Sequence, residues 1–87
     1  MIEKLIQKYV EKINIEDIER FAEQNNVHLT SEESKYLYHI MKTKWENVVF
    51  GDTEPILKEA KLHLSPNTYK KAEELLYFYR DKYKRYL

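Results

Sequence analysis

The side chains best suited to binding chemistry are cations and aromatic rings gathered near the end of the chain. They are Lys70, Lys71, Tyr77, Phe78, Lys82 and Arg85. Nucleobases can stack on such rings while lysines contact phosphate, but aromatic residues with an arginine at the rim are also typical of protein interfaces. Glu74 and Asp81 interrupt the basic face, and the whole chain has a formal net charge of zero. The pattern therefore favours a protein partner over nucleic acid, because a polyanion is attracted by net positive charge.

Nucleophilic and phosphate-binding chemistry finds little support. The chain has no cysteine, so a nucleophile would have to be serine, threonine or lysine. Thr30, Ser31 and Ser65 are explained as residues that begin helices. The only glycine is Gly51, which excludes glycine-rich phosphate loops because these need several glycines. We therefore expect a protein that is not an enzyme.

A metal or cofactor site is not expected either. His63, one of three histidines, follows Glu59 by four residues, a spacing that places two ligands on one face of a helix. The sequence has no HExxH or paired-histidine motif, and a histidine near a helix C-terminus is also explained by the helix dipole. We expect no cofactor and no metal ligand.

Five helices are expected to position these side chains. Apolar residues recur at the spacing of three to four that lines one side of a helix, in a chain with one glycine and two prolines. The expected helices cover residues 2–13, 15–25, 31–47, 54–63 and 66–86. A chain of 87 residues has the size of one domain and can bury a core without disulfides or metals. The fold prediction is an all-α, compact single-domain bundle over residues 1–87, with a long C-terminal helix.

Capping residues mark where several of these helices begin. Asn14 can accept a hydrogen bond from an orphan amide of the second helix. Thr30 and Glu33 have the spacing of a capping box at the start of the third. Ser65 and Pro66 suit the cap and the first position of the last helix, where no amide hydrogen is needed.

Two helix ends are also predicted. The pair Asn25-Asn26 is typical of a left-handed helix end. Residues 48–50 are β-branched and aromatic, so they can be either helical or extended before Gly51. We expect the third helix to break between Asn47 and Gly51.

Five apolar stripes define the expected core faces. They consist of Ile2, Leu5, Ile6, Tyr9, Val10 and Ile13 in the first helix, Ile15, Ile18, Phe21 and Ala22 in the second, Ser34, Leu37, Tyr38, Met41, Trp45 and Val48 in the third, Ile56, Leu57, Ala60 and Leu64 in the fourth, and Tyr69, Ala72, Leu76, Tyr79, Tyr83 and Tyr86 in the last. The last stripe is expected to pack against the first, third and fourth helices. Tyr77 and Phe78 fall outside it, so they either form an exposed surface or are covered by another helix, for instance the first.

The N-terminal segment does not have the pattern of a targeting signal. Charged Glu3 and Lys4 stand among the apolar residues of segment 1–6, so the uninterrupted apolar run of a signal peptide is missing. No segment is long and apolar enough to span a bilayer. Because the lack of cysteine suits a reducing compartment, we expect a cytoplasmic protein with no membrane partner.

Four short motifs carry a family resemblance. They are NIEDIERFA at 14–22, VHLTSEE at 27–33, ILKEA at 56–60 and SPNT at 65–68. In this order they resemble the YqfT-like proteins, which are small bacterial proteins, and the likeness covers most of the chain. The resemblance implies a small bacterial cytosolic helical protein without assigned activity, and it transfers no functional residue.

The functional prediction is a non-enzymatic protein-interaction module. Self-association through the outer face of the C-terminal helix is one form of this prediction. The alternative is a nucleic-acid-binding accessory protein that uses the same basic and aromatic face. Salt distinguishes the two, because phosphate-driven binding weakens steeply as salt rises and an aromatic protein interface changes little.

Overall fold

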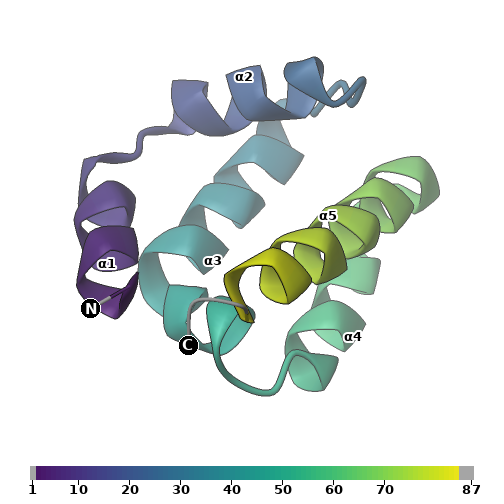
Figure 1. The fold of residues 1–87 in the computed structure, drawn as a ribbon. Coiled ribbons are helices and arrows are strands. Elements are labelled where there is room, and N and C mark those ends of the chain that lie inside the picture. The colour runs from purple at the N-terminus through teal and green to yellow at the C-terminus, as the bar shows by residue number, and fades with distance from the viewer. Residues whose placement is uncertain (1, 85–87) are drawn as a thin grey trace. The chain divides into compact units, whose positions relative to one another are not determined.

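The regular secondary structure is helical throughout the described part of the chain. The computed structural model describes residues 2–84, which contain five helices and no strand (Figure 1). The helices are α1 (Ile2–Lys12), α2 (Ile15–Gln24), α3 (Ser31–Val49), α4 (Glu54–His63) and α5 (Pro66–Lys84). The all-α prediction and its five helical segments are confirmed. The predicted last residues of the C-terminal helix, 85 and 86, lie outside the described residues.

The chain divides into two compact units, Met1–Trp45 and Glu46–Leu87. The first unit holds α1, α2 and most of α3, and the second holds the end of α3 together with α4 and α5. The expectation of one domain over the whole chain stays a prediction. Across residues 2–84, no helix combines the length and the apolar character that a membrane span requires.

Two capping boxes begin helices in the first unit. The Asn14 side chain accepts a hydrogen bond from the Asp17 amide at 2.9 Å, and the Asn14 amide donates to the Asp17 carboxylate at 3.0 Å. At the start of α3, Thr30 Oγ1 accepts from the Glu33 amide at 3.1 Å, and the Thr30 amide donates to Glu33 Oε1 at 3.0 Å. Both predicted caps are confirmed, because each side chain satisfies an amide that has no partner inside its helix.

The end of α2 is a left-handed turn at Asn26. Its φ is 63°, and the Val27 amide donates to the Ala22 carbonyl at 2.8 Å while the Asn26 amide donates to the Glu23 carbonyl at 3.0 Å. These two bonds form a Schellman motif, in which asparagine tolerates the left-handed position. The predicted helix end is therefore confirmed.

Apolar and polar contacts both hold the first unit together. Val10, Ile18, Ala22 and Ile40 are its buried hydrophobic residues. Ser34 is fully buried, and its hydroxyl donates to Glu19 Oε2 at 3.0 Å, which joins α3 to α2. Ile40 was not predicted to be buried, although it follows Leu37 by three residues and so shares that face of the helix.

Part of the predicted core is exposed, which corrects the expectation for Leu5, Tyr9 and Phe21. Successive residues of a helix are turned by about 100°. Tyr9 is therefore turned well away from buried Val10, and Phe21 lies at the edge of the face formed by Ile18 and Ala22. Helical spacing placed these side chains near the core face, but it did not decide how wide the covered part of that face is.

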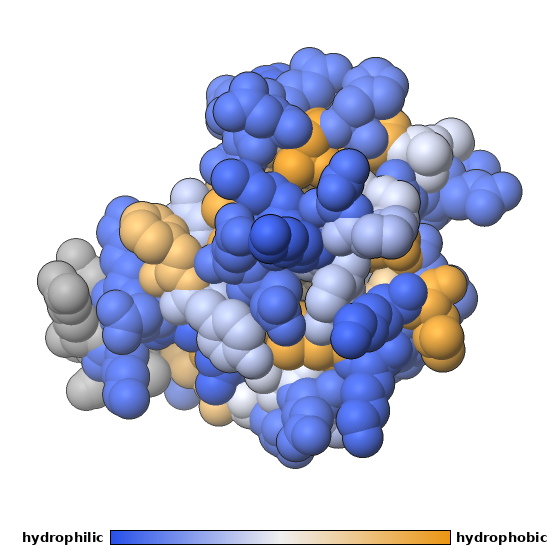
Figure 2. All heavy atoms as spheres, turned by 90° about the vertical axis from the view of Figure 1, so that its right-hand side faces the viewer, coloured by the Kyte–Doolittle hydropathy of each residue, from blue (hydrophilic) through white to orange (hydrophobic). Residues whose placement is uncertain are grey.

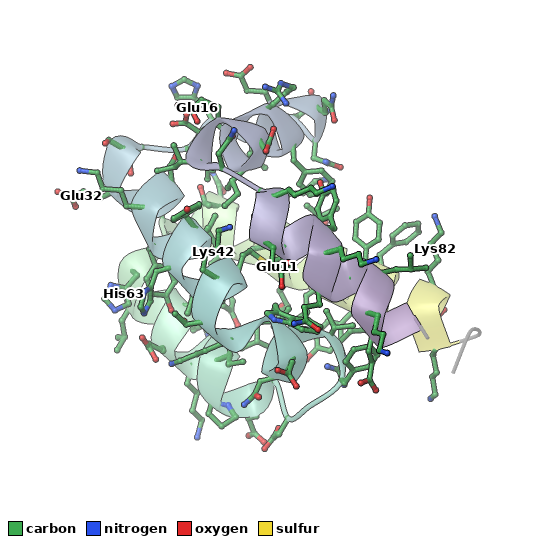
Figure 3. All side chains as sticks on the ribbon, turned by 90° about the vertical axis from the view of Figure 1, so that its left-hand side faces the viewer. Glu11, Glu16, Glu32, Lys42, His63 and Lys82 are labelled. Carbon is green, nitrogen blue, oxygen red and sulfur yellow. The ribbon has the colours of Figure 1, made fainter. Side chains whose placement is uncertain are left out.

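Lys42 connects α3 to the end of α1. Its Nζ donates to the Val10 carbonyl at 2.7 Å and to the Glu11 carbonyl at 3.0 Å, and Figure 3 shows Lys42 lying between the two helices near Glu11. The last carbonyls of a helix lack partners within it and carry its negative dipole end. A cation that is 31 residues or more away in sequence therefore stabilises the end of α1.

α3 is kinked close to the boundary between the units. Lys44 has non-helical dihedral angles, with φ −130° and ψ 20°. One residue earlier, Thr43 Oγ1 donates a 2.7 Å hydrogen bond to the His39 carbonyl. A threonine hydroxyl that bonds the carbonyl four residues back bends a helix, so the kink has an identifiable side-chain cause.

In the second unit, α3 ends at Val49, within the predicted window between Asn47 and Gly51. The Gly51 amide donates to the Glu46 and Asn47 carbonyls, each at 3.1 Å. A Cβ on Gly51 would lie 2.9 Å from the Asn47 Cα atom, so the chain passes the last turn of α3 too closely for a side chain. α4 begins shortly after, where Asp52 Oδ1 accepts from the Glu54 amide at 3.1 Å.

α4 and α5 lie side by side in the second unit (Figure 1). Ile56, Ala60 and Leu64 are buried hydrophobic residues of this unit, and Thr68 is a buried polar one. The three apolar residues recur at steps of four, which lines one side of a helix and its immediate C-terminal extension. The predicted buried face of the fourth helix is confirmed at these three positions.

Candidate interaction surface

α5 begins where its sequence predicts. Pro66 is its first residue, and the Ser65 carbonyl accepts the first helical hydrogen bond from the Tyr69 amide at 2.8 Å. The Ser65 hydroxyl donates to Thr68 Oγ1 at 2.9 Å. Proline costs nothing at this position because amides of the first turn have no acceptor inside the helix. The start of α5 therefore rests on local sequence alone.

The first turns of α5 are engaged with α4. Lys61 Nζ stands 5.5 Å from the centre of the Tyr69 ring, a cation–π geometry. The Tyr69 hydroxyl donates to Glu73 Oε2 at 3.1 Å. Burial raises the pKa of the Tyr69 phenol, and its hydrogen bond to Glu73 raises the pKa further. Tyr69 is thus a protonated donor at neutral pH, which suits a structural contact and not a general base.

Arg80 secures the later turns of α5 to the end of α3. Its Nη1 donates to the Val48 carbonyl at 2.8 Å and approaches the Asn47 carbonyl at 3.5 Å. Val48 belongs to the last turn of α3, where the carbonyl groups find no amide donor within the helix. Sequence reasoning missed this role, because the two partners are 32 residues apart and a lone arginine on a basic helix gives no signal of it.

The predicted surface residues do not share one environment. Lys70 and Lys82 are exposed and Lys71 is partly buried, with its Nζ 4.0 Å from Glu74 Oε2. Tyr77 is 52% exposed and Phe78 is 62% exposed. Figure 3 shows Lys82 projecting away from the ribbon of α5, and Arg85 lies outside the described residues. Exposure of both rings meets one requirement of the predicted interaction surface, whose function stays a prediction.

Tyr77 and Phe78 face different neighbours. Tyr77 lines an open hollow of about 470 Å³ that is bounded by α5, by α4 and by the segment that leads into α4. The other residues around this hollow are Asp52, Thr53, Glu54, Leu57, Lys58, Lys61, Tyr69 and Glu73. The Phe78 ring instead makes an edge-to-face contact with Tyr79, with the ring centres 5.2 Å apart. The two rings are thus separated around the helix, and Phe78 stands on the side away from the hollow.

Several polar side chains around the hollow beside Tyr77 are already engaged within the protein. Tyr69 is bonded to Glu73, Lys61 lies over the Tyr69 ring, and Asp52 accepts from the Glu54 amide. These groups already serve contacts within the protein. Among the described residues, no group of three His, Asp or Glu side chains is arranged to hold a metal ion.

Apolar side chains also reach the surface away from α5. The large ones that are exposed in the described chain are Leu5, Tyr9, Phe21, Leu62, Tyr77 and Phe78. On the face drawn in Figure 2, hydrophobic residues form separate patches among predominantly hydrophilic ones. Scattered apolar residues are normal on a protein surface. Tyr77 and Phe78 are the two members of this set that lie on α5, among its exposed charged residues.

Fold and surface together define a small all-α protein with a mixed-charge aromatic face on its C-terminal helix. The chain belongs to DUF2624, a family of proteins of unknown function, whose family model matches residues 1–80. No curated protein and no solved structure matches the chain. The family match supports the expectation of a small family without assigned activity, and the narrower YqfT-like resemblance stays a prediction.

Proposed function

We propose that this chain is a non-enzymatic protein-interaction module that binds its partner through the outer face of α5. The observation that carries the proposal is that Phe78 is 62% exposed on a helix that Tyr69 and Arg80 already attach to α4 and α3. Burying a phenylalanine side chain is worth about 1.5–3 kcal/mol. Because Phe78 is already partly covered, a partner that buries the rest gains the exposed share of this free energy, and the attached side of α5 needs no rearrangement.

The charges around Phe78 favour a protein partner over nucleic acid. Glu74, Asp81 and Lys82 are all exposed on α5, so cations and anions alternate along the face. A phosphate backbone would meet both signs of charge, whereas a protein surface can match them one by one at the rim of an interface. A cytoplasmic location in a bacterial cell belongs to the same proposal, and the YqfT-like resemblance and the lack of cysteine support it.

Photo-crosslinking from position 78 tests the proposal. The photoreactive analogue p-benzoylphenylalanine replaces Phe78 in the full chain, and cells that produce this chain are irradiated. We expect a covalent adduct with a protein, because the benzophenone takes the place of the ring that the partner covers. Mass spectrometry of the adduct identifies whether that protein is another chain or a second copy of this one.

The matched control places the same analogue at Leu62, which is 84% exposed on α4 in the same unit. Random collisions label both positions equally, so only an excess at position 78 supports the proposal. Equal labelling at 62 and 78 would contradict it. An adduct with nucleic acid would support the alternative function, as would in vitro binding of an oligonucleotide that weakens steeply with salt.

A further inference from the structure

Glu74, Phe78 and Lys82 form one ridge on the outer face of α5. They are spaced by four residues within Pro66–Lys84, and side chains at that spacing lie one above the next along a helix. All three are exposed, the Glu74 side chain by 57% and the Phe78 residue by 62%. An acid, an aromatic ring and a base therefore follow one another along a surface ridge.

This order of charges is complementary to itself in one direction only. If a second ridge runs antiparallel to the first, a two-fold axis at Phe78 places each Glu74 opposite the Lys82 of the other copy. If the second ridge runs parallel, each charge meets its own kind. A two-fold arrangement repeats every contact, so both ion pairs form at once around the two phenylalanine rings.

We propose that the outer face of α5 binds a second copy of this chain, in an antiparallel pair with Phe78 at the two-fold axis and with Glu74 and Lys82 paired across it. This inference rests on the proposed function and specifies its partner. The two rings supply the apolar contact, and the flanking charges set direction and register, which is the role that charged groups usually have at an interface rim.

The contacts of Glu74 within its own chain leave it able to pair in this way. Its Oε2 atom is 4.0 Å from Lys71 Nζ, and both side chains are substantially exposed. An exposed pair at this distance is weak, so exchanging Lys71 for Lys82 of a second copy costs little. Lys71 precedes Glu74 by three residues on α5, so it stays at the edge of the paired surface after the exchange.

Charge reversal tests the pairing directly. In a chain with Glu74→Lys, lysines would face lysines, and with Lys82→Glu, glutamates would face glutamates. Each single variant then exchanges two attractive pairs for two repulsive ones, and we expect its self-association to weaken on the order of tenfold to a hundredfold. Sedimentation equilibrium of the full-length chain measures this change against the wild type.

Mixing the two variants gives the decisive result. A pair made of one Glu74→Lys chain and one Lys82→Glu chain contains two opposite-charge contacts, so we expect it to associate about as tightly as the wild type. Native mass spectrometry, with one variant labelled with ¹⁵N, distinguishes this mixed pair from the two symmetric ones. A parallel pair would respond differently. Each single reversal would exchange one like-charge contact for another and leave association unchanged, and the mixed pair would associate more tightly than the wild type instead of matching it.

Charge reversals elsewhere provide the matched controls. Glu23→Lys and Lys35→Glu change exposed residues of α2 and α3 and should leave association unchanged. Wild-type association that both α5 reversals leave intact would overturn the register. A chain that stays monomeric at high micromolar concentration would overturn self-pairing altogether. In that case a position-78 adduct with a different protein would preserve the proposed function, whereas the lack of any such adduct would contradict both proposals.

Discussion

Replacing Arg80 by methionine should loosen the second unit while leaving the outer face of α5 intact. Methionine keeps much of the length of the arginine stem but cannot donate to the carbonyls at the end of α3. The lost bond is the one from Nη1 to the Val48 carbonyl at 2.8 Å. The approach to the Asn47 carbonyl at 3.5 Å adds little, since the Gly51 amide already donates to that carbonyl at 3.1 Å.

The size of the effect follows from the environment of this bond. A hydrogen bond from a charged donor contributes about 1.5–3 kcal/mol, and the cation also faces the negative end of the α3 dipole. Arg80 and Val48 are both partly exposed, so water replaces some of the lost interaction in the variant. We therefore expect the free energy of unfolding to fall by about 1–2 kcal/mol, which lowers the melting temperature of a domain this small by roughly 5–15 °C.

Thermal and urea unfolding followed by circular dichroism measure this change. Lys70→Met is the matched control, because Lys70 is an exposed cation on the same helix and its loss should change stability by less than about 0.5 kcal/mol. Arg80→Lys keeps the charge but not the planar fork, and we expect an intermediate loss. If Arg80→Met and Lys70→Met melt at the same temperature, the bond to Val48 does not stabilise the fold and the reasoning fails.

Three further predictions follow from other contacts. Gly51→Ala should destabilise the chain by about 1–3 kcal/mol in urea unfolding, because its Cβ would meet the Asn47 Cα atom at 2.9 Å; an unchanged midpoint would show that the turn relaxes freely. The amide of Asn14, and then Arg20, lowers the pKa of Asp17 below its usual 3.8, so Asp17→Asn should cost stability at neutral pH. That cost should vanish as the pH falls through the folded-state pKa, and a pH-independent difference would contradict it. Tyr77→Ala combined with Phe78→Ala should keep the wild-type melting temperature and lose self-association, and unfolding of this double variant would show that the rings belong to the core.

Two cationic side chains bond the C-terminal ends of helices, and these contacts could not be predicted from the sequence. Lys42 donates to carbonyls of α1 and Arg80 to a carbonyl of α3. Each contact joins residues more than 30 positions apart. Neither was predicted, because surface lysines and arginines are common on amphipathic helices and their spacing does not show which distant carbonyl they reach.

The candidate surface was only partly predictable for the same reason. Helical spacing placed Tyr77 and Phe78 off the apolar stripe of the last helix, and both are exposed in the structure. It did not show that Tyr77 lines the hollow beside α4 while Phe78 contacts Tyr79. Adjacent residues on a helix are turned by about 100°, but what each meets depends on the neighbouring helix.

By itself, the amino-acid sequence determined the all-α class, the helical segments and most of the helix boundaries. Those features depend on contacts within a few residues, such as the capping box of Thr30 and Glu33 and the left-handed turn at Asn26. Only the tertiary structure decided that Leu5 is exposed and that the hydroxyl of Ser34 donates to Glu19. Helical periodicity defines which residues share a face, whereas burial depends on how far another element covers that face.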